Sequence, residues 1–111
     1  MENAGLIVET KGYGFIASSV MKNEKVSWGA KALYAYLISI SGNHPSCWPS
    51  NSTIMKNLAM KSKITLNKFK DELVREKLLK IEERKYKSGQ LASNSYFPAK
   101  VKLAEKDTAP E

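Results

Sequence analysis

Four lysines fall within ten residues that contain no acidic side chain, in the segment KSKITLNKFK at residues 61–70. Lysine ammonium groups bind phosphate oxygens and can donate to guanine O6 or N7, and an asparagine can form two hydrogen bonds with adenine. Such a cluster is typical of a surface that binds a polyanion, although a solvated helix face has the same composition. Whether one element holds these side chains on one exposed face decides between the two interpretations.

The whole chain carries the same sign of charge. Its 111 residues contain 18 Lys and Arg against 11 Asp and Glu, a formal net charge of +7. This balance favours nucleic acid as the partner first and an acidic lipid surface second. A length of 111 residues predicts one domain with a possible tail.

The lysine cluster lies on the second of two predicted helices. Ser50 is placed to cap a short helix, residues 59–61 form a turn, and Ser62 is placed to cap a second helix over about residues 62–77. Leu66, Phe69 and Leu73 follow at helical spacing and predict a buried stripe. The opposite face is expected to carry Lys63, Thr65, Asn67, Lys68 and Lys70. A helix–turn–helix with a basic second helix is the shape that enters a DNA major groove.

An earlier amphipathic helix supplies the expected core partner. Ser27 is placed to cap it and Gly42 to end it, and Trp28, Ala30, Leu33, Tyr36, Leu37 and Ile40 are predicted to form its buried stripe. A short opening turn is expected to pack Phe15, Ile16 and Val20 onto the core. Residues 46–48 are long enough for a minimal strand.

A β-hairpin is predicted after the second helix of the motif. Leu79 and Ile81 alternate with Lys80 and Glu82, which is the period of a half-buried strand. Gly89 permits the reversal, and the chain returns through residues 93–97. A hairpin in this position is a wing. Residues 1–12 are expected to form an arm, residues 13–98 the domain, and residues 99–111 a polar tail or linker.

Catalytic and metal chemistry have little support in the composition. Cys47 and His44 are the only cysteine and histidine, so neither a disulfide, a zinc set nor a nucleophile–base pair is expected. Cys47 is interpreted as a small buried hydrophobe and His44 as a loop residue. No cofactor, metal or enzymatic activity is predicted. Without a signal sequence or an apolar run of membrane-spanning length, a cytoplasmic location is expected.

The order of these elements resembles the winged helix–turn–helix domains of phage and plasmid replication proteins, including the DnaD-like N-terminal domains of replisome organisers and plasmid replication initiators. The resemblance covers residues 13–98. It rests on the segments YGFIASSVM at 13–21, SWGAKALYAYL at 27–37, CWPS at 47–50, SKITLNK at 62–68, EL at 72–73 and SNSY at 93–96. The chain departs from the family pattern at Ala59, where such turns often carry glycine, and at Lys77, where a helix-ending glycine is usual. Both departures are expected to affect local geometry and not the fold.

The resemblance implies a mainly α fold with a small β-hairpin, in which three helices form the core and the hairpin forms the wing. It also implies sequence-preferring binding to double-stranded DNA, often as a homodimer on repeated or inverted sites and together with other replication proteins, with no catalytic activity. Replication initiation in a phage or plasmid is the expected role, and a winged-helix transcriptional regulator is the alternative.

The candidate contacts fall into three groups. The second helix of the motif is expected to read bases through Lys63, Asn67 and Lys68, to contact a thymine methyl or a phosphate through Thr65, and to bind phosphates through Lys61, Ser62 and Lys70. The start of the first helix is expected to hold the flanking phosphates through Ser50, Asn51 and Ser52. The wing is expected to reach the adjacent backbone or minor groove through Lys85, Lys87, Gln90 and Asn94.

Two other functions remain open. A protein–protein module could pair the hairpin edge or the arm at Leu6, Ile7 and Val8 with a partner strand. The segment KGYGFI at residues 11–16 resembles the aromatic RNA-binding segments of RRM and cold-shock domains, so Tyr13 and Phe15 could stack on single-stranded bases. Its context differs from both families, because only ten residues precede it and a helical pattern follows.

Overall fold

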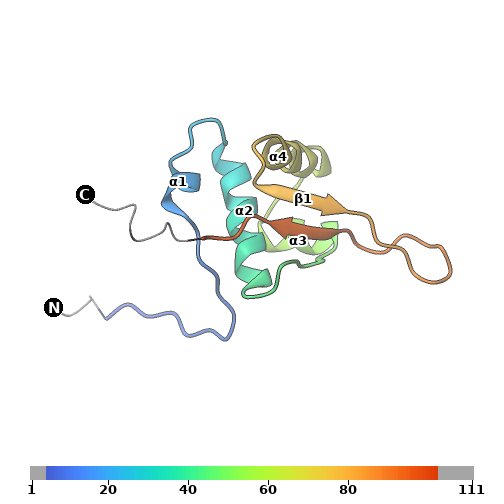
Figure 1. The fold of residues 1–111 in the computed structure, drawn as a ribbon, viewed down its shortest axis with the longest axis horizontal. Coiled ribbons are helices and arrows are strands. Elements are labelled where there is room, and N and C mark those ends of the chain that lie inside the picture. The colour runs from blue at the N-terminus through green and yellow to red at the C-terminus, as the bar shows by residue number, and fades with distance from the viewer. Residues whose placement is uncertain (1–4, 103–111) are drawn as a thin grey trace.

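The computed structural model describes residues 5–102 and shows a winged helix–turn–helix. Its elements in chain order are α1 (Ser18–Met21), α2 (Trp28–Ser41), α3 (Asn51–Asn57), α4 (Lys63–Arg75), β1 (Leu79–Glu82) and β2 (Ser95–Pro98). Helices α2, α3 and α4 pack around one core, and β1 and β2 lie across it (Figure 1). The predicted fold class is therefore confirmed.

Three serines cap the three core helices, as their sequence positions predict. The side-chain oxygen of Ser27 accepts from the amide of Ala30, that of Ser50 from Thr53, and that of Ser62 from Thr65. Each bond satisfies an amide that the first helical turn leaves without a partner.

The hairpin forms as predicted, and a third short segment pairs with its second strand. In the antiparallel register, Leu79 pairs with Pro98 and Ile81 with Tyr96. Cys47 pairs with the other edge of β2 through two backbone bonds to Tyr96, at 3.0 and 2.7 Å. The loop after β1 extends beyond the helices (Figure 1). The predicted strand around residues 46–48 is thus a single bridge that joins the α2–α3 connection to the wing.

The predicted buried stripe of α2 is partly wrong. Trp28 is 84% exposed and Ile40 is 44% exposed, whereas Ala30, Leu33 and Leu37 are buried as expected. The buried face also includes Tyr34 and Ile38. At ~100° per residue, Trp28 lies ~160° around the helix from Ala30, so it points away from this face. Because α2 is apolar on most of its circumference, its sequence alone does not fix which face is buried.

The opening segment packs less than predicted. Val20 is buried and Ile16 is partly buried against the core, but Phe15 is 72% exposed. The rings of Phe15 and Tyr13 instead pack edge to face, with centroids 6.0 Å apart and an interplanar angle of 87°. The prediction that Phe15 packs onto the core is therefore wrong.

Two residues of the expected tail contact the domain. The carbonyl of Ala99 accepts a hydrogen bond from the Tyr34 hydroxyl, and the amide of Ala99 donates to the carbonyl of Leu78. The ammonium of Lys100 donates to Ser41 Oγ and, at 3.0 Å, to the carbonyl of Gly42. Lys100 thus donates to the carbonyl of the residue that ends α2, and its positive charge interacts favourably with the negative end of the helix dipole. The ordered packing therefore continues past Pro98.

Candidate nucleic-acid interface

Helix α4 presents one face to the core and the opposite face to solvent. Leu66 and Leu73 are fully buried and Phe69 is partly buried against the core, so the predicted inner stripe is confirmed. At ~100° per residue, Ile64 and Lys68 lie nearly opposite Leu66, while Lys63 and Asn67 lie on one flank and Thr65 on the other. The side chains of Ile64, Asn67, Lys68, Asp71, Glu72 and Arg75 border a shallow hollow along this outer side.

The basic end of α4 is available for a ligand. Lys61, Lys63, Asn67 and Lys68 are exposed, and the carboxylate of Asp71 first follows one turn later. Within residues 5–102, the ion pairs shorter than 4 Å join Arg75 to Glu76 and Lys80 to Glu82, so none of the three exposed lysines at this end is paired. The ammonium groups at this end are therefore free of direct ion pairs within the described part of the chain, and Lys68 acts on Glu72 only at longer range.

Lys70 does not lie on the outer face. Its side chain is buried, with 6% exposure, and its ammonium donates to Asn51 Oδ1 and to the Tyr96 hydroxyl, both at 2.7 Å. It also lies 5.0 Å from the centre of the Tyr96 ring. The expected phosphate contact is a wrong prediction, because Lys70 follows the buried Leu66 by four positions and precedes Leu73 by three, which places it on the inner side of α4. Acceptors on α3 and β2 satisfy its charge inside the protein.

The start of α3 is polar, but its side chains are already engaged within the domain. Ser50 Oγ caps α3 and lies 3.1 Å from Ser52 Oγ, while Asn51 Oδ1 accepts from Lys70. A small, mostly polar cleft nevertheless brings Ser50 and Asn51 together with Asn94 of the wing's return segment. Of these, Ser52 is the most open to solvent.

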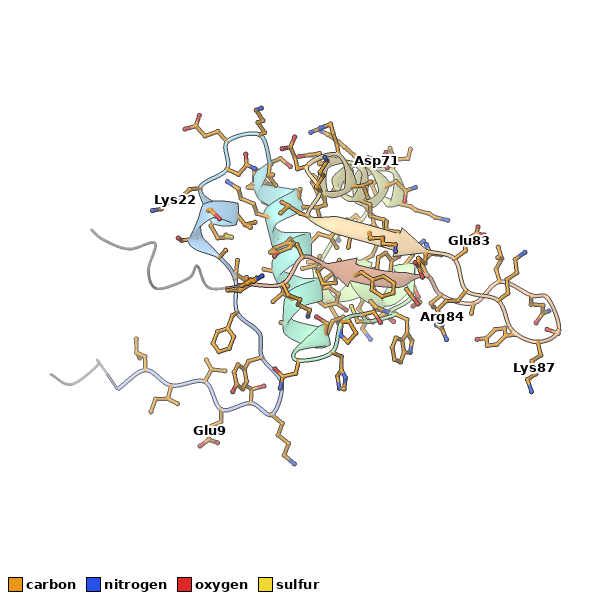
Figure 2. The ribbon with its side chains drawn as sticks, viewed as in Figure 1. Glu9, Lys22, Asp71, Glu83, Arg84 and Lys87 are labelled. Carbon is orange, nitrogen blue, oxygen red and sulfur yellow. The ribbon has the colours of Figure 1, made fainter. Side chains whose placement is uncertain are left out.

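The wing presents basic side chains from a short hydrogen-bonded loop. The amide of Tyr86 donates to the carbonyl of Gln90, and Gly89 turns the chain with φ of 91°. Lys85, Lys87 and Gln90 are exposed, and Lys87 points away from the body of the domain (Figure 2).

Arg84 fixes the base of the wing and was not expected to have a role. Its guanidinium lies 5.4 Å from the centre of the Trp48 ring and donates to the carbonyl of Ser93 at 3.2 Å. Arg84 thereby ties both sides of the loop to the α2–α3 connection. Arg84 and Trp48 are far apart in sequence, so no local pattern signals this contact.

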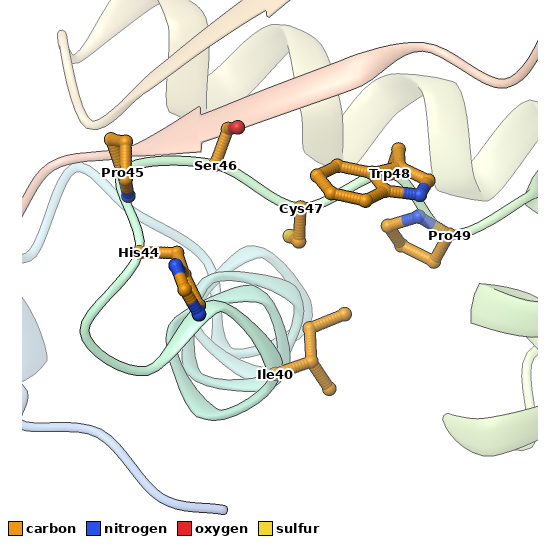
Figure 3. Close-up of a pocket in the computed structure, with 7 residues that line it drawn as sticks. All are labelled: Ile40, His44, Pro45, Ser46, Cys47, Trp48 and Pro49. Atoms are coloured by element: carbon orange, nitrogen blue, oxygen red, sulfur yellow. The ribbon is translucent and has the colours of Figure 1, made fainter.

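A second hollow lies beside the α2–α3 connection and is bordered by Ile40, His44, Pro45, Ser46, Cys47, Trp48 and Pro49 (Figure 3). Cys47 is buried, as predicted, and its sulfur lies 3.8 Å from the carbonyl of Leu37. Burial raises the pKa of the Cys47 thiol to about 11, although Lys100 acts in the opposite direction. The thiol is therefore protonated at neutral pH and is a poor nucleophile or metal ligand.

Residues 5–102 meet neither the requirements of a metal site nor those of a membrane-spanning helix. No cluster of three or more His, Cys, Asp or Glu side chains there is placed to hold a metal ion. No helix in that range has the length and apolar character needed to cross a bilayer.

Comparison with known families matches residues 27–79 to a helix-turn-helix domain. The matched segment runs from the cap of α2 to the first residue of β1, and so contains all three core helices. Searches of curated proteins and of solved structures gave no match. The family match supports a helix-turn-helix DNA-binding domain in this part of the chain.

Proposed function

We propose that this domain binds double-stranded DNA with a sequence preference, placing the amino-terminal half of α4 in the major groove and the wing on the adjacent backbone or minor groove. The observation that carries the proposal is the outer surface of α4. Lys63, Asn67 and Lys68 are exposed there, without an acidic residue between positions 61 and 70, on a helix whose other face is held by the core.

The proposed contacts divide into those that read bases and those that bind phosphates. Lys63, Asn67 and Lys68 are assigned to base edges, because lysine can donate to guanine and asparagine can pair with adenine. Lys61, Ser52 and the wing residues Lys85, Lys87 and Gln90 are assigned to phosphate or minor-groove contacts. Lys70 is excluded because it is buried.

The setting implied by the resemblance is replication initiation in a phage or plasmid, with a homodimer on repeated or inverted half-sites. The same surface serves a transcriptional regulator equally well. Sizing the protein–DNA complex tests the dimer. Locating the bound sites relative to a replication origin or a promoter separates the two roles.

Selection of duplexes from a random pool, followed by affinity measurements, tests the proposal itself. Lys63→Ala or Asn67→Ala should lower the affinity for the selected duplex by ~1–3 kcal/mol and relax the preference at one position. Lys22→Ala is a suitable control, because Lys22 is exposed near α1, away from α4 (Figure 2). Equal losses on selected and random duplexes would contradict base reading, and no salt-dependent duplex binding at all would contradict the whole proposal.

A second candidate function is binding of single-stranded RNA or DNA through Tyr13 and Phe15. Tyr13 is 62% exposed and Phe15 is 72% exposed, so both rings are accessible for base stacking. In that case the protein should prefer single-stranded oligonucleotides, and the double substitution Tyr13→Ala with Phe15→Ala should abolish binding. Retention of duplex binding by this double variant supports α4 as the interface.

A further inference from the structure

Ile64 lies on the outer face of α4, in the first turn of the helix. Its side chain is 83% exposed, although it follows Lys63 within the first turn of a helix that buries Leu66 and Leu73 completely. At ~100° per residue, Ile64 is about 160° from Leu66, so it points almost directly away from the core. Neither the core nor the capping of α4 explains an isoleucine at this position.

The surroundings of Ile64 are polar. The other side chains that border the hollow on this surface come from Asn67, Lys68, Asp71, Glu72 and Arg75. Ile64 is therefore an isolated apolar side chain among charged and amide groups. An apolar group of a ligand placed in this hollow would contact Ile64, the apolar side chain among those that border it.

The DNA major groove offers one apolar group to such a side chain. Among the four bases, only thymine presents a methyl group there, at C5, beside the hydrogen-bond donors and acceptors of its neighbours. Isoleucine has no side-chain donor or acceptor, so it cannot read any other feature of a base edge.

We propose that Ile64 reads the C5-methyl group of a thymine in the bound site. This inference rests on the proposed function, because it requires α4 to lie in the major groove. Asn67 and Lys68 follow Ile64 by three and four positions, so their Cβ atoms are ~5–6 Å from its own. With base pairs ~3.4 Å apart, the thymine lies within one or two base pairs of the base that Asn67 or Lys68 contacts.

The test replaces thymine by deoxyuridine, which removes only the methyl group. In the duplex selected by the intact chain, each thymine is exchanged in turn and the Kd is measured. One exchange should weaken binding about fourfold, which corresponds to the ~0.8 kcal/mol expected for one buried methyl group. The Ile64→Ala variant should bind the thymine and deoxyuridine duplexes with equal affinity at that position.

Val74→Ala is the matched control. Val74 is an apolar residue on the same helix, 46% exposed and near its carboxyl end. This variant should keep the fourfold discrimination, and thermal unfolding should confirm that both variants are folded.

Two results overturn the inference while leaving duplex binding intact: no thymine is sensitive to loss of its methyl group, or Ile64→Ala keeps the sensitivity. Failure of the proposed function is distinct, since the intact chain then selects no duplex from the pool. That result overturns the role of Ile64 as well.

Discussion

Glu72 on α4 accepts two hydrogen bonds from Ser27 at the start of α2, one from the backbone amide and one from the hydroxyl, both at 2.9 Å. The same hydroxyl oxygen accepts from the amide of Ala30, at 3.3 Å. Ser27 therefore caps its own helix and anchors it to the helix that is proposed to enter DNA. This contact fixes the position of α4 relative to the rest of the core.

Stability should fall in acid because of this carboxylate. The Ser27 backbone amide is the largest of the effects that hold the pKa of Glu72 below its usual value. The Ser27 hydroxyl, Lys68 and Arg75 act in the same direction, against the effect of burial. A group with a lowered pKa in the folded state contributes stability above its unfolded pKa of about 4.3 and loses it as the pH falls through the folded pKa. Unfolding by denaturant should therefore show the contribution at neutral pH and its loss in acid.

Glu72→Ala should lower the free energy of unfolding at pH 7 by ~1–3 kcal/mol, the usual effect of removing hydrogen bonds to a charged group. The difference from the unsubstituted protein should shrink as the pH falls through the folded pKa of Glu72. Glu83→Ala, at an exposed carboxylate near the wing, is the control and should change stability little. A destabilisation that is constant from pH 7 down to pH 2 would show that packing, and not charge, is what Glu72 supplies.

Gly29 should not tolerate a larger side chain, although alanine is normally the better helix former. A Cβ atom at this position would lie 2.1 Å from Cζ of Phe69 on α4. Gly29→Ala should therefore destabilise the domain by ~1–3 kcal/mol, the usual cost of an overpacked core. Chemical denaturation measures the change.

A second substitution tests the cause. Adding Phe69→Leu to Gly29→Ala replaces the opposing ring with a shorter side chain and should recover part of the loss, so that the two effects are not additive. If the double variant is less stable by the sum of the two single changes, the contact with Phe69 is not the cause.

The local features of this fold follow from the sequence, whereas several contacts between distant elements do not. The caps at Ser27, Ser50 and Ser62 are confirmed, because a cap depends on an amide only three residues away. Burial of Glu72 depends on Ser27, 45 residues away, and burial of Lys70 on partners 19 and 26 residues away. Charged side chains are rarely buried unless paired, so the residue type favours an exposed position for both.

The candidate interface was predictable to the same extent. The exposure of Lys63, Asn67 and Lys68 follows from the period of the helix. The same period places Ile64 on the outer side, although isoleucine is a residue type that is usually buried. The tie between Arg84 and Trp48 depends on how the wing folds back, which no local pattern specifies.

Replacing Ala59 or Lys77 with glycine should stabilise the folded domain. The resemblance to winged-helix domains identifies both as positions that often carry glycine, and both have positive φ, at 55° and 62°. A left-handed conformation costs a residue with a Cβ atom ~1–2 kcal/mol, partly offset by the greater freedom that glycine loses on folding, ~0.5–1 kcal/mol. Ala59→Gly and Lys77→Gly should therefore each stabilise the domain by ~0.5–1 kcal/mol.

Ala32→Gly is the control, because Ala32 lies inside α2 in a right-handed helical conformation. It should lower stability by ~1 kcal/mol, opposite in sign. Denaturant midpoints of the three variants measure the changes. Destabilisation at all three positions would mean that the unfolded-state effect of glycine exceeds the strain at Ala59 and Lys77.

Substitution of Lys68 should affect DNA binding and substitution of Lys70 should affect stability, although the two residues are only two positions apart on α4. Lys68 is exposed, so Lys68→Ala should lower the slope of log K against log salt by ~0.9 if its ammonium contacts a phosphate, and should leave it unchanged if Lys68 binds only a base. Lys70 is buried between Asn51 and Tyr96, so Lys70→Met should leave the slope unchanged and lower the free energy of unfolding by ~1–3 kcal/mol.

Tyr96→Phe provides a milder test of the same buried contact, since it removes only the hydroxyl that accepts from Lys70. It should destabilise the domain less than Lys70→Met and leave the salt dependence of DNA binding unchanged. Measurements at a temperature where all variants are folded keep the two effects apart. A salt slope that falls by ~0.9 in Lys70→Met would mean that Lys70 leaves its buried position and reaches phosphate in the complex.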